Sequence, residues 1–345
     1  MTGANIETLV GTPVEPFIEV RRGSYLESVH SISACVARAD GEILYASGNV
    51  HRAYPVRSLA KPFLVREVIR NGAADAYTLG DVELALAAGS HDGERRHVAG
   101  VRDFLAKVGV DEDALQCGPA LEGRVAVGPP VANNCSGKHV ALLALCRHLS
   151  LSTDGYTTAE HPAQQLLLPA LLKAFGRKAV DTPLVVDGCS LPIFGASLHE
   201  IATAYARFGI ADDPISMRVR DAMTAQPGYV GGWLGNLDTQ IIEWSNGSII
   251  GKIGAEGLHA DTAVGRGLGI AIKVLDGNSR ALAPTLVRFF LGFIDNVPIA
   301  QHHLAKLAAP AILNAVGGYV GDIRAITIST GVEFSDVHSS RRSTS

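Results

Sequence analysis

The sequence has few aromatic residues and almost no excess of charge of either sign. Phe, Tyr and Trp together make up 6% of the 345 residues, which is too few to predict a surface on which nucleic-acid bases stack. The formal net charge is only -4, and acidic and basic residues are spread along the chain. Because such a balance attracts neither nucleic acid nor an anionic membrane, we expect neither as a partner.

Long apolar runs are also missing, and we do not expect a secretory leader. No segment approaches the roughly 20 uninterrupted apolar residues that span a bilayer. Residues 1–7 lack the charged region followed by an apolar run that marks a signal peptide. The cysteines are odd in number and widely spaced: Cys35, Cys117, Cys135, Cys146 and Cys189. This is not a disulfide framework, so we expect a cytoplasmic protein with thiols that are free, buried or bound to metal.

Apolar residues are abundant, at 47% of the chain, and they alternate between strand and helix patterns. Runs at 33–38 and 42–46, joined by Ala39-Asp40-Gly41, predict a hairpin. Helical spacing follows at 59–69, where Asn71-Gly72 ends the helix, and at 82–88, 98–108, 139–149 and 163–175. The last third predicts strands at 240–244, 248–253, 269–274 and 323–328, and a helix at 281–293.

The order strands, helices, strands predicts an α+β fold: an α/β sandwich with a mainly antiparallel sheet and an inserted helical domain. We expect a discontinuous sheet domain at 1–57 and 211–334, and a mainly helical domain at 58–210. The tail at 335–345 is polar and without periodicity, so it is expected to be disordered.

The first chemical signal is an S-x-x-K motif, Ser58-Leu59-Ala60-Lys61. At a helix start, a serine hydroxyl and a lysine amine three residues apart share one face. Free backbone N–H groups there also favour a developing oxyanion. This pattern predicts Ser58 as a nucleophile and Lys61 as its base. The alternative is a capping serine followed by a solvated lysine, because short motifs often occur by chance.

Two further elements favour the catalytic interpretation. Ser90-His91-Asp92 stands in a Gly-flanked loop after a helix, as the S-D-N element does in penicillin-recognising serine enzymes, and Lys252-Ile253-Gly254 stands on a predicted strand in the place of their K-T-G. The order of the three elements matches. The short interval between Ser58 and Ser90 argues against a penicillin-recognising enzyme in the strict sense.

A third cluster joins 133–139 with Asp187-Gly188-Cys189. Two cysteines and a carboxylate are possible zinc ligands, but no C-x-x-C or H-x-x-x-H spacing supports a metal site. Spacing alone therefore favours buried structural cysteines. Four histidines are likewise expected to be surface or core residues rather than ligands: His30, His51, His97 and His199.

Separate motifs along nearly the whole chain resemble those of the rhizobial-type L-asparaginases, the asparaginase II family. They are Arg22-Gly23, Glu27-Ser28-Val29-His30, Arg57-Ser58-Leu59-Ala60-Lys61-Pro62, Ser90-His91-Asp92-Gly93-Glu94 with His97, Cys117-Gly118-Pro119, Asn133-Asn134-Cys135-Ser136-Gly137-Lys138-His139, Asp187-Gly188-Cys189, Lys252-Ile253-Gly254-Ala255-Glu256-Gly257 and Lys273-Val274-Leu275-Asp276-Gly277. Ser31 and Ser190 depart from the glycines that are commoner there, and the polar tail after Glu333 has no counterpart.

The resemblance implies a fold similar to serine β-lactamases and glutaminases, and the hydrolysis of L-asparagine to L-aspartate and ammonia. It implies two Ser–Lys pairs, Ser58 with Lys61 and Ser90 with Lys252. It also implies a metal, typically zinc, held by the residues Cys135, Lys138 and Cys189, with Asp187 beside it. Lysine is a rare zinc ligand and must be neutral to bind. A homodimer is implied as well.

The expected mechanism needs a neutral lysine. A free lysine has a pKa of about 10.4, so burial and a nearby cation at Lys252 must lower the pKa of Lys61 by roughly three units, or about 4 kcal/mol. Ser58 then attacks the carboxamide carbon, and Ser90 with Lys252 relays a proton to ammonia. Water hydrolyses the aspartyl ester. We expect Arg57, His91 and Asp187 to bind the zwitterionic substrate.

Two alternatives stay open from the sequence. One is a related acyl hydrolase, either a glutaminase or a β-lactamase-like enzyme. The other is a non-catalytic protein that binds metal or an amino acid. Intact Ser and Lys residues at all four positions argue against the second, because a protein that had lost catalysis would be free to lose any of them.

Overall fold

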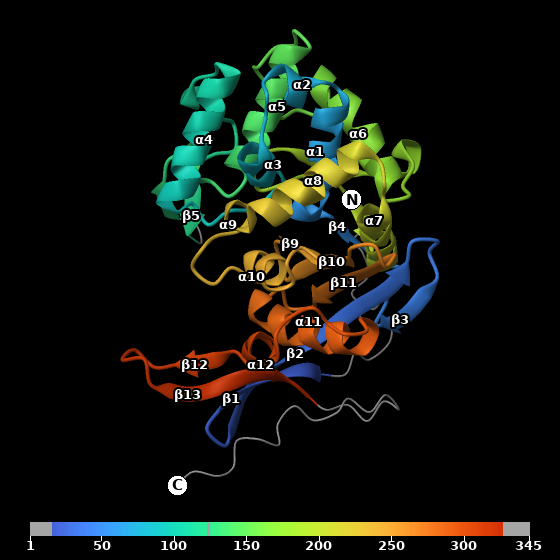
Figure 1. Ribbon diagram of the computed structural model, residues 1–345, viewed down its shortest axis with the longest axis vertical. Coiled ribbons are helices and arrows are strands. Elements are labelled where there is room, and N and C mark those ends of the chain that lie inside the picture. The colour runs from blue at the N-terminus through green and yellow to red at the C-terminus, as the bar shows by residue number, and fades with distance from the viewer. Residues whose placement is uncertain (1–15, 123–124, 327–345) are drawn as a thin grey trace, which may run out of the picture.

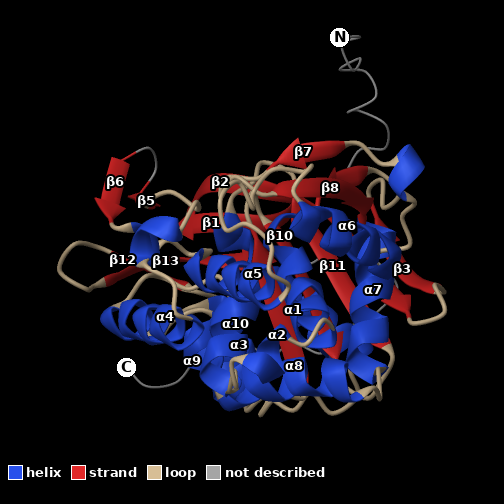
Figure 2. Ribbon diagram, turned by 90° about the horizontal axis from the view of Figure 1, so that it is seen from above, coloured by secondary structure: helices blue, strands red, loops and turns tan. Residues whose placement is uncertain are grey.

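A computed structural model describes residues 16–122 and 125–326. Helices form one half of the molecule and a large sheet forms most of the other (Figure 1). Seen from above, the helices lie over the sheet (Figure 2). Within the described ranges, no helix combines the length and the apolar character that crossing a membrane requires.

The main sheet is antiparallel and has the order β12-β13-β1-β2-β11-β10-β9, with β3 paired to β2. Its strands are β1 (Pro16–Arg22), β2 (Tyr25–Arg38), β3 (Ile43–Ser47), β9 (Ile249–Gly254), β10 (Leu258–Ala263), β11 (Leu268–Val274), β12 (Ala311–Leu313) and β13 (Tyr319–Ala325). Strands from both parts of the chain meet at the β2–β11 pair, where Ser33 lies opposite Lys273. The predicted α+β class with an antiparallel sheet is confirmed.

Successive residues of β2 enter two different cores because side chains of a strand point alternately to opposite faces. Cys35 and Ala37 belong to the core on the face of α7 (Leu198–Ile210). Ala34 and Val36 belong to the core formed with α11 (Leu282–Phe293) and α12 (Gln301–Ala308). Helix α7 packs so closely that a Cβ at Gly269 of β11 would lie 1.9 Å from the Ala202 carbonyl oxygen. The sheet is therefore covered by helices on both faces.

Helices form the other half of the molecule (Figure 1). Its elements are the 3-10 helix η2 (Arg57–Ala60), α1 (Lys61–Arg70), α2 (Ala73–Ala76), α3 (Asp81–Ala88), α4 (Arg95–Val108), α5 (Ser136–His148), α6 (Pro162–Ala174), α8 (Pro214–Ala225) and α9 (Pro227–Val230). Helix α3 is central and contacts α1, α4, α5, α8 and α9. Helix α7, inside the expected helical segment, packs on the sheet, whereas α8 and α9, beyond that segment, pack among the helices.

Two smaller groups of strands lie outside the main sheet in the described part of the chain. A second sheet joins β4 (Ala53–Pro55), β8 (Pro192–Ser197) and β7 (Leu184–Val186). A hairpin of β5 (Ala120–Glu122) and β6 (Val125–Gly128) projects at one corner of the molecule (Figure 2). Short 3-10 helices complete the described chain: η3 (Glu112–Ala114), η4 (Pro130–Ala132), η5 (Ala179–Asp181) and η6 (Ser279–Ala281).

Most of the predicted elements are confirmed, including the 33–46 hairpin and the helices near 59–69, 98–108 and 281–293. The strand at 240–244 is wrong, because it belongs to helix α10 (Leu237–Trp244). Asn236 accepts hydrogen bonds from the N–H groups of Asp238 and Thr239 and starts this helix. Strand β10 was not predicted, and the last strand begins at Tyr319 rather than 323. The tail at 335–345 lies outside the described residues.

The α3–α5 contact predicts a stability effect. A Cβ at Gly137 of α5 would lie 2.5 Å from the Leu86 carbonyl oxygen. We expect Gly137→Ala to lower the free energy of unfolding by about 1–3 kcal/mol, because the helices must separate. Gly195→Ala is the control, since its Cβ would meet nothing nearer than 3.5 Å. Urea denaturation of both variants tests this, and equal stabilities would show that the two helices are not tightly apposed.

Candidate active site

A pocket of about 630 Å³ is lined by residues of the helical half and by residues of and next to strand β9 of the main sheet. Its size falls within the range of roughly 300–1,000 Å³ that is usual for small-molecule sites. Its lining includes many of the predicted site residues: Arg57, Ser58, Ser90, His91, Cys135, Asp187 and Cys189. The three predicted lysines, Lys61, Lys138 and Lys252, are at most 4% exposed. The fold thus brings the predicted serines to one surface and buries the lysines.

Ser58 is the second residue of η2 and is half-buried in the pocket wall. The preceding residue, Arg57, has a φ of 50°, a left-handed conformation that is unfavourable for a side chain of this kind. Backbone bonds hold this turn, from Val56 N–H to the Phe194 carbonyl and from Leu59 N–H to the Val56 carbonyl. The strained turn therefore presents Ser58 to the pocket immediately before α1.

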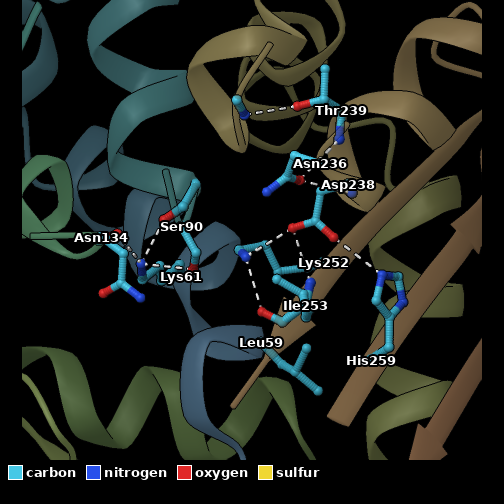
Figure 3. Close-up of polar contacts among 12 residues, drawn as sticks. Leu59, Lys61, Ser90, Asn134, Asn236, Asp238, Thr239, Lys252, Ile253 and His259 are labelled. Carbon is cyan, nitrogen blue, oxygen red and sulfur yellow. Dashed lines mark hydrogen bonds and ion pairs between the residues drawn. The ribbon is translucent and has the colours of Figure 1, made fainter. Parts of the chain in front are cut away.

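Lys61 is the first residue of α1, and its ammonium group is surrounded by acceptors. Nζ donates to the Gly89 carbonyl at 2.6 Å, to Ser90 Oγ at 2.9 Å and to the Asn134 carbonyl at 3.0 Å (Figure 3). Burial lowers the pKa of Lys61 to about 8, and the cations of Lys138 and Lys252 act in the same direction, against the opposing effect of Cys135. A substantial neutral fraction is therefore present near pH 8.

The loop that carries Ser90 is fixed by its backbone. Ser90 N–H donates to the Val230 carbonyl at 2.8 Å, and Asp92 N–H donates to the Gly231 carbonyl at 2.7 Å. A Cβ at Gly89 would lie 2.4 Å from the same Val230 carbonyl oxygen, so glycine allows this close approach. Ser90 is thereby held against Lys61.

Lys252 differs from the prediction in its partner. The hydrogen bonds found for it among the described residues run from Nζ to Asp238 Oδ2 at 3.0 Å and to the Ile253 carbonyl at 2.9 Å. The serine expected beside it, Ser90, is bonded to Lys61 instead. Strand β9, which carries Lys252, nevertheless contacts η2, which carries Ser58.

Asp238 and its further partners His259 and Asp261 were missed by the sequence analysis. The sequence predicts a strand at 240–244, just after Asp238, whereas Asp238 lies in the first turn of helix α10. His259 and Asp261 lie on the strand that was not predicted. Their alternation with apolar residues in Leu258–Ala263 was the available signal.

His91 lines the pocket as a neutral ring. Its Nδ1 accepts from Gly93 N–H at 3.2 Å, so the proton is assigned to Nε2, which lies 2.9 Å from Ser136 Oγ. Burial places the pKa of His91 well below its ordinary value, and His97 and Lys61 act in the same direction. With both nitrogens engaged inside the protein, His91 supplies no charge to a substrate and instead ties its loop to α5.

Arg57 and Asp187 bring opposite charges to the pocket wall. Arg57 Nε lies 3.0 Å from Asp187 Oδ1. Burial raises the pKa of Asp187, but Lys138 and Arg57 outweigh it and leave the pKa below its ordinary value. Asp187 is therefore a carboxylate at neutral pH, and this pair is suited to a zwitterionic ligand.

The predicted metal ligands converge. Lys138 Nζ donates to Cys189 Sγ at 3.0 Å, the Cys189 thiol contacts Cys135, and its sulfur lies 3.5 Å from Asp187 Oδ2. Across 16–122 and 125–326, no three His, Cys, Asp or Glu side chains are arranged to hold a metal ion. The donors that a metal would meet at this place are the two cysteine sulfurs and the Lys138 amine. Two thiols and an amine fit zinc in donor chemistry, once each has lost its proton.

Comparison with solved structures finds remote likenesses. A β-lactamase from Mycobacterium bovis is 16% identical with a TM-score of 0.42, and the match spans 84% of this chain and 98% of the β-lactamase. The native form of Mglu is 12% identical with a TM-score of 0.42, and the match spans 80% of this chain and 62% of Mglu. EstCE1, a hydrolase with promiscuous acyltransferase activity, is 10% identical with a TM-score of 0.36, and the match spans 72% of this chain and 90% of EstCE1. No curated protein matches.

Family membership rests on a match along the sequence. The model of the family described as L-asparaginase II matches residues 18–325, a range that includes the pocket, Ser58, Lys61, Ser90 and Lys252, and the Cys135–Lys138–Cys189 cluster. The chain belongs to the L-asparaginase II family, a family of asparaginase-type amidohydrolases.

Proposed function

We propose that this protein hydrolyses L-asparagine to L-aspartate and ammonia through an acyl-enzyme on Ser58. The observation that carries the proposal is a buried lysine whose pKa is lowered to about 8, three residues after a serine in the pocket wall. Such a lysine can serve as a general base near neutral pH. The family match supports the amide as the bond that is broken.

In the first half of the reaction, neutral Lys61 takes the Ser58 proton as Oγ bonds to the side-chain carboxamide carbon. In the tetrahedral intermediate, the bond between the carboxamide carbon and its nitrogen then breaks. The amino group takes up a proton and leaves as ammonia. Ser90 Oγ, bonded to Lys61 Nζ at 2.9 Å, provides the route for that proton. In this arrangement, Lys61 and Ser90 together return the proton to the leaving nitrogen. Lys252 contributes a positive charge.

In the second half, water attacks the aspartyl ester and gives its proton to Lys61. The bond from carbon to Ser58 Oγ breaks, and the proton returns to Ser58 as aspartate leaves. The substrate's α-carboxylate is assigned to Arg57, and its ammonium to the carboxylate of Asp187. The Leu59 N–H, already bonded to the Val56 carbonyl, is not free to stabilise the oxyanion.

Zinc would be held by Cys135, Lys138 and Cys189. It would supply a Lewis-acidic centre beside Asp187 at which an oxygen of the substrate could be oriented. The protein's own residues carry each proton transfer in this scheme. A homodimer and a cytoplasmic location complete the proposal, and light scattering of the purified protein tests the dimer.

The test is ammonia release from L-asparagine and from L-glutamine, with and without chelator, together with a chromogenic lactam. We expect release from asparagine, and a higher KM after chelation because substrate orientation suffers. Cys189→Ser should reduce the zinc content measured by atomic absorption. Lactam hydrolysis without ammonia release would favour a β-lactamase-like enzyme. A higher melting temperature with asparagine that is never consumed would favour a binding protein.

A further inference from the structure

A row of buried charged groups runs from Lys252 into the sheet domain, and the reaction scheme above gives most of it no role. Asp238 Oδ2 accepts from Lys252 Nζ, and Asp238 Oδ1 lies 3.1 Å from His259 Nε2 (Figure 3). His259 Nδ1 lies 3.0 Å from Asp261 Oδ2. All four residues are at most 1% exposed. Burying an unpaired charge costs several kcal/mol, so these groups depend on one another.

Asp238 occupies a position from which it can reach both faces of the sheet. Strand β9 is the last strand of the described part of the main sheet, and the Ile253 N–H donates to Asp238 Oδ2 at 3.0 Å. Lys252 lies opposite Ala260, whereas His259 lies opposite Ile253, so the Lys252 and His259 side chains leave opposite faces. The carboxylate at the strand edge meets both of them.

The strand is also shaped for this row. A Cβ at Gly251 would lie 2.6 Å from Asp261 Oδ1 and 3.0 Å from His259 Cε1. Glycine at this position of β9 therefore leaves space for the His259–Asp261 pair. Asn236, which caps α10, accepts from Asp238 N–H at 3.0 Å and fixes the carboxylate at the helix start.

Asp238 and His259 carry opposite charges. Burial lowers the pKa of His259, but Asp261 and Asp238 outweigh it and raise the pKa to about 9. Burial raises the pKa of Asp238, and Lys252 and His259 bring it well below its ordinary value. At neutral pH the His259 ring is thus a cation that supports the Asp238 carboxylate, and this carboxylate faces the Lys252 ammonium.

We propose that Asp238, backed by His259 and Asp261, is a positioning residue that keeps Lys252 cationic and directed toward the Ser58–Lys61 centre. This inference rests on the proposed hydrolysis. Lys252 then acts as a fixed positive charge during acyl transfer and exchanges no proton as a second base. The titratable groups around it are Asp238 from α10, His259 and Asp261 from β10, Lys61 from α1 and Tyr205 from α7.

The test begins with Asp238→Asn, which keeps the shape of the side chain and removes its charge. A buried ammonium without a counterion loses its proton more readily. We expect kcat to fall about 10- to 100-fold with little change in KM. The decline of kcat at alkaline pH, which is expected where the ammonium loses its proton, should move to lower pH by about one unit or more. Asp75→Asn is the control, because Asp75 is 72% exposed and pairs with Arg218 away from the pocket.

A double variant separates positioning from general damage to the fold. If Asp238 acts through Lys252, then Asp238→Asn combined with Lys252→Met should be no slower than Lys252→Met alone. Additive losses would overturn the inference. A folded Asp238→Asn protein with wild-type kcat and pH profile would also overturn it. His259→Gln replaces Asp238→Asn in the same measurements if the latter does not fold.

A second measurement needs no turnover. The ¹³Cε resonance of Lys252, assigned by its loss in Lys252→Met, should titrate at lower pH in Asp238→Asn than in the wild type. Identical titrations would contradict the inference even in an active enzyme. A wild-type protein that releases no ammonia would instead contradict the proposed function, and this titration would still decide the role of Asp238.

Discussion

Ser58→Ala is expected to lower kcat for asparagine by on the order of 10⁴-fold or more while the protein stays folded. The turn around Ser58 is held by backbone hydrogen bonds of Val56 and Leu59, and within residues 16–122 and 125–326 no hydrogen bond of Ser58 Oγ would be lost with the nucleophile. The measurement is ammonia release under single-turnover and steady-state conditions, with the melting temperature as a check on folding.

Two further variants make this result specific. Ser90→Ala removes the partner of Lys61 but keeps the nucleophile, and a smaller loss of about 100-fold is expected. Ser152→Ala, whose hydroxyl bonds locally to Asp154 on an exposed loop, should match the wild type. Acid quenching followed by mass spectrometry should find an aspartyl ester on the peptide that contains Ser58. Ammonia release from Ser58→Ala at more than a few per cent of the wild-type rate would exclude Ser58 as the nucleophile.

Lys61→Met is expected to lower kcat about 10³-fold, within the range attributed to a general base. In the wild type, kcat/KM should rise with pH and reach half its maximum near pH 8, because the neutral amine accepts the proton and the pKa of Lys61 is about 8. The pH profile between 6 and 10 tests this. A rise centred near the ordinary lysine value of 10.5 would show that another group, or an unperturbed lysine, sets the rate.

The same group links stability to pH. Its pKa is lower in the folded protein than the ordinary 10.5, so between about 8 and 10.5 the unfolded chain binds more protons than the folded one. Stability therefore rises with pH across this window, and the burial penalty present below pH 8, about 3 kcal/mol, is relieved. Urea unfolding of wild type and Lys61→Met at pH 7 and pH 10 isolates this term. Equal pH dependence of both proteins would contradict it.

The sequence indicated those parts of the site whose residues lie close together along the chain. Ser58 and Lys61 share one turn, so their local spacing alone indicated a serine nucleophile and its base. The order of the motifs along the chain indicated Ser90 and Lys252, whereas the metal ligands Cys135, Lys138 and Cys189 were implied only by the resemblance to a family. The pocket residues that were predicted on this basis lie together in the fold.

The partners of the two lysines could not be predicted, because they depend on tertiary packing. Lys61 reaches Ser90 only because Gly89 allows its loop to approach Val230. Asp238 meets Lys252 across the edge of β9, and its own helix was mistaken for a strand because of the short apolar pair Ile241-Ile242. Which helices cover the sheet was equally hidden, since amphipathic helices in both halves show the same period.

The pairing of β2 with β11 has a consequence for the order in which this protein folds. Ser33 must wait for Lys273, so the sheet cannot close until the whole helical half has been synthesised. Contacts of such long sequence separation form slowly, whereas α1 to α6 contact one another within a shorter stretch. During synthesis, Ser58 and Lys61 will therefore be in place well before β9 brings Lys252 to them. A ribosome-bound chain ending before β9 would carry the nucleophile but lack the charge that completes the site.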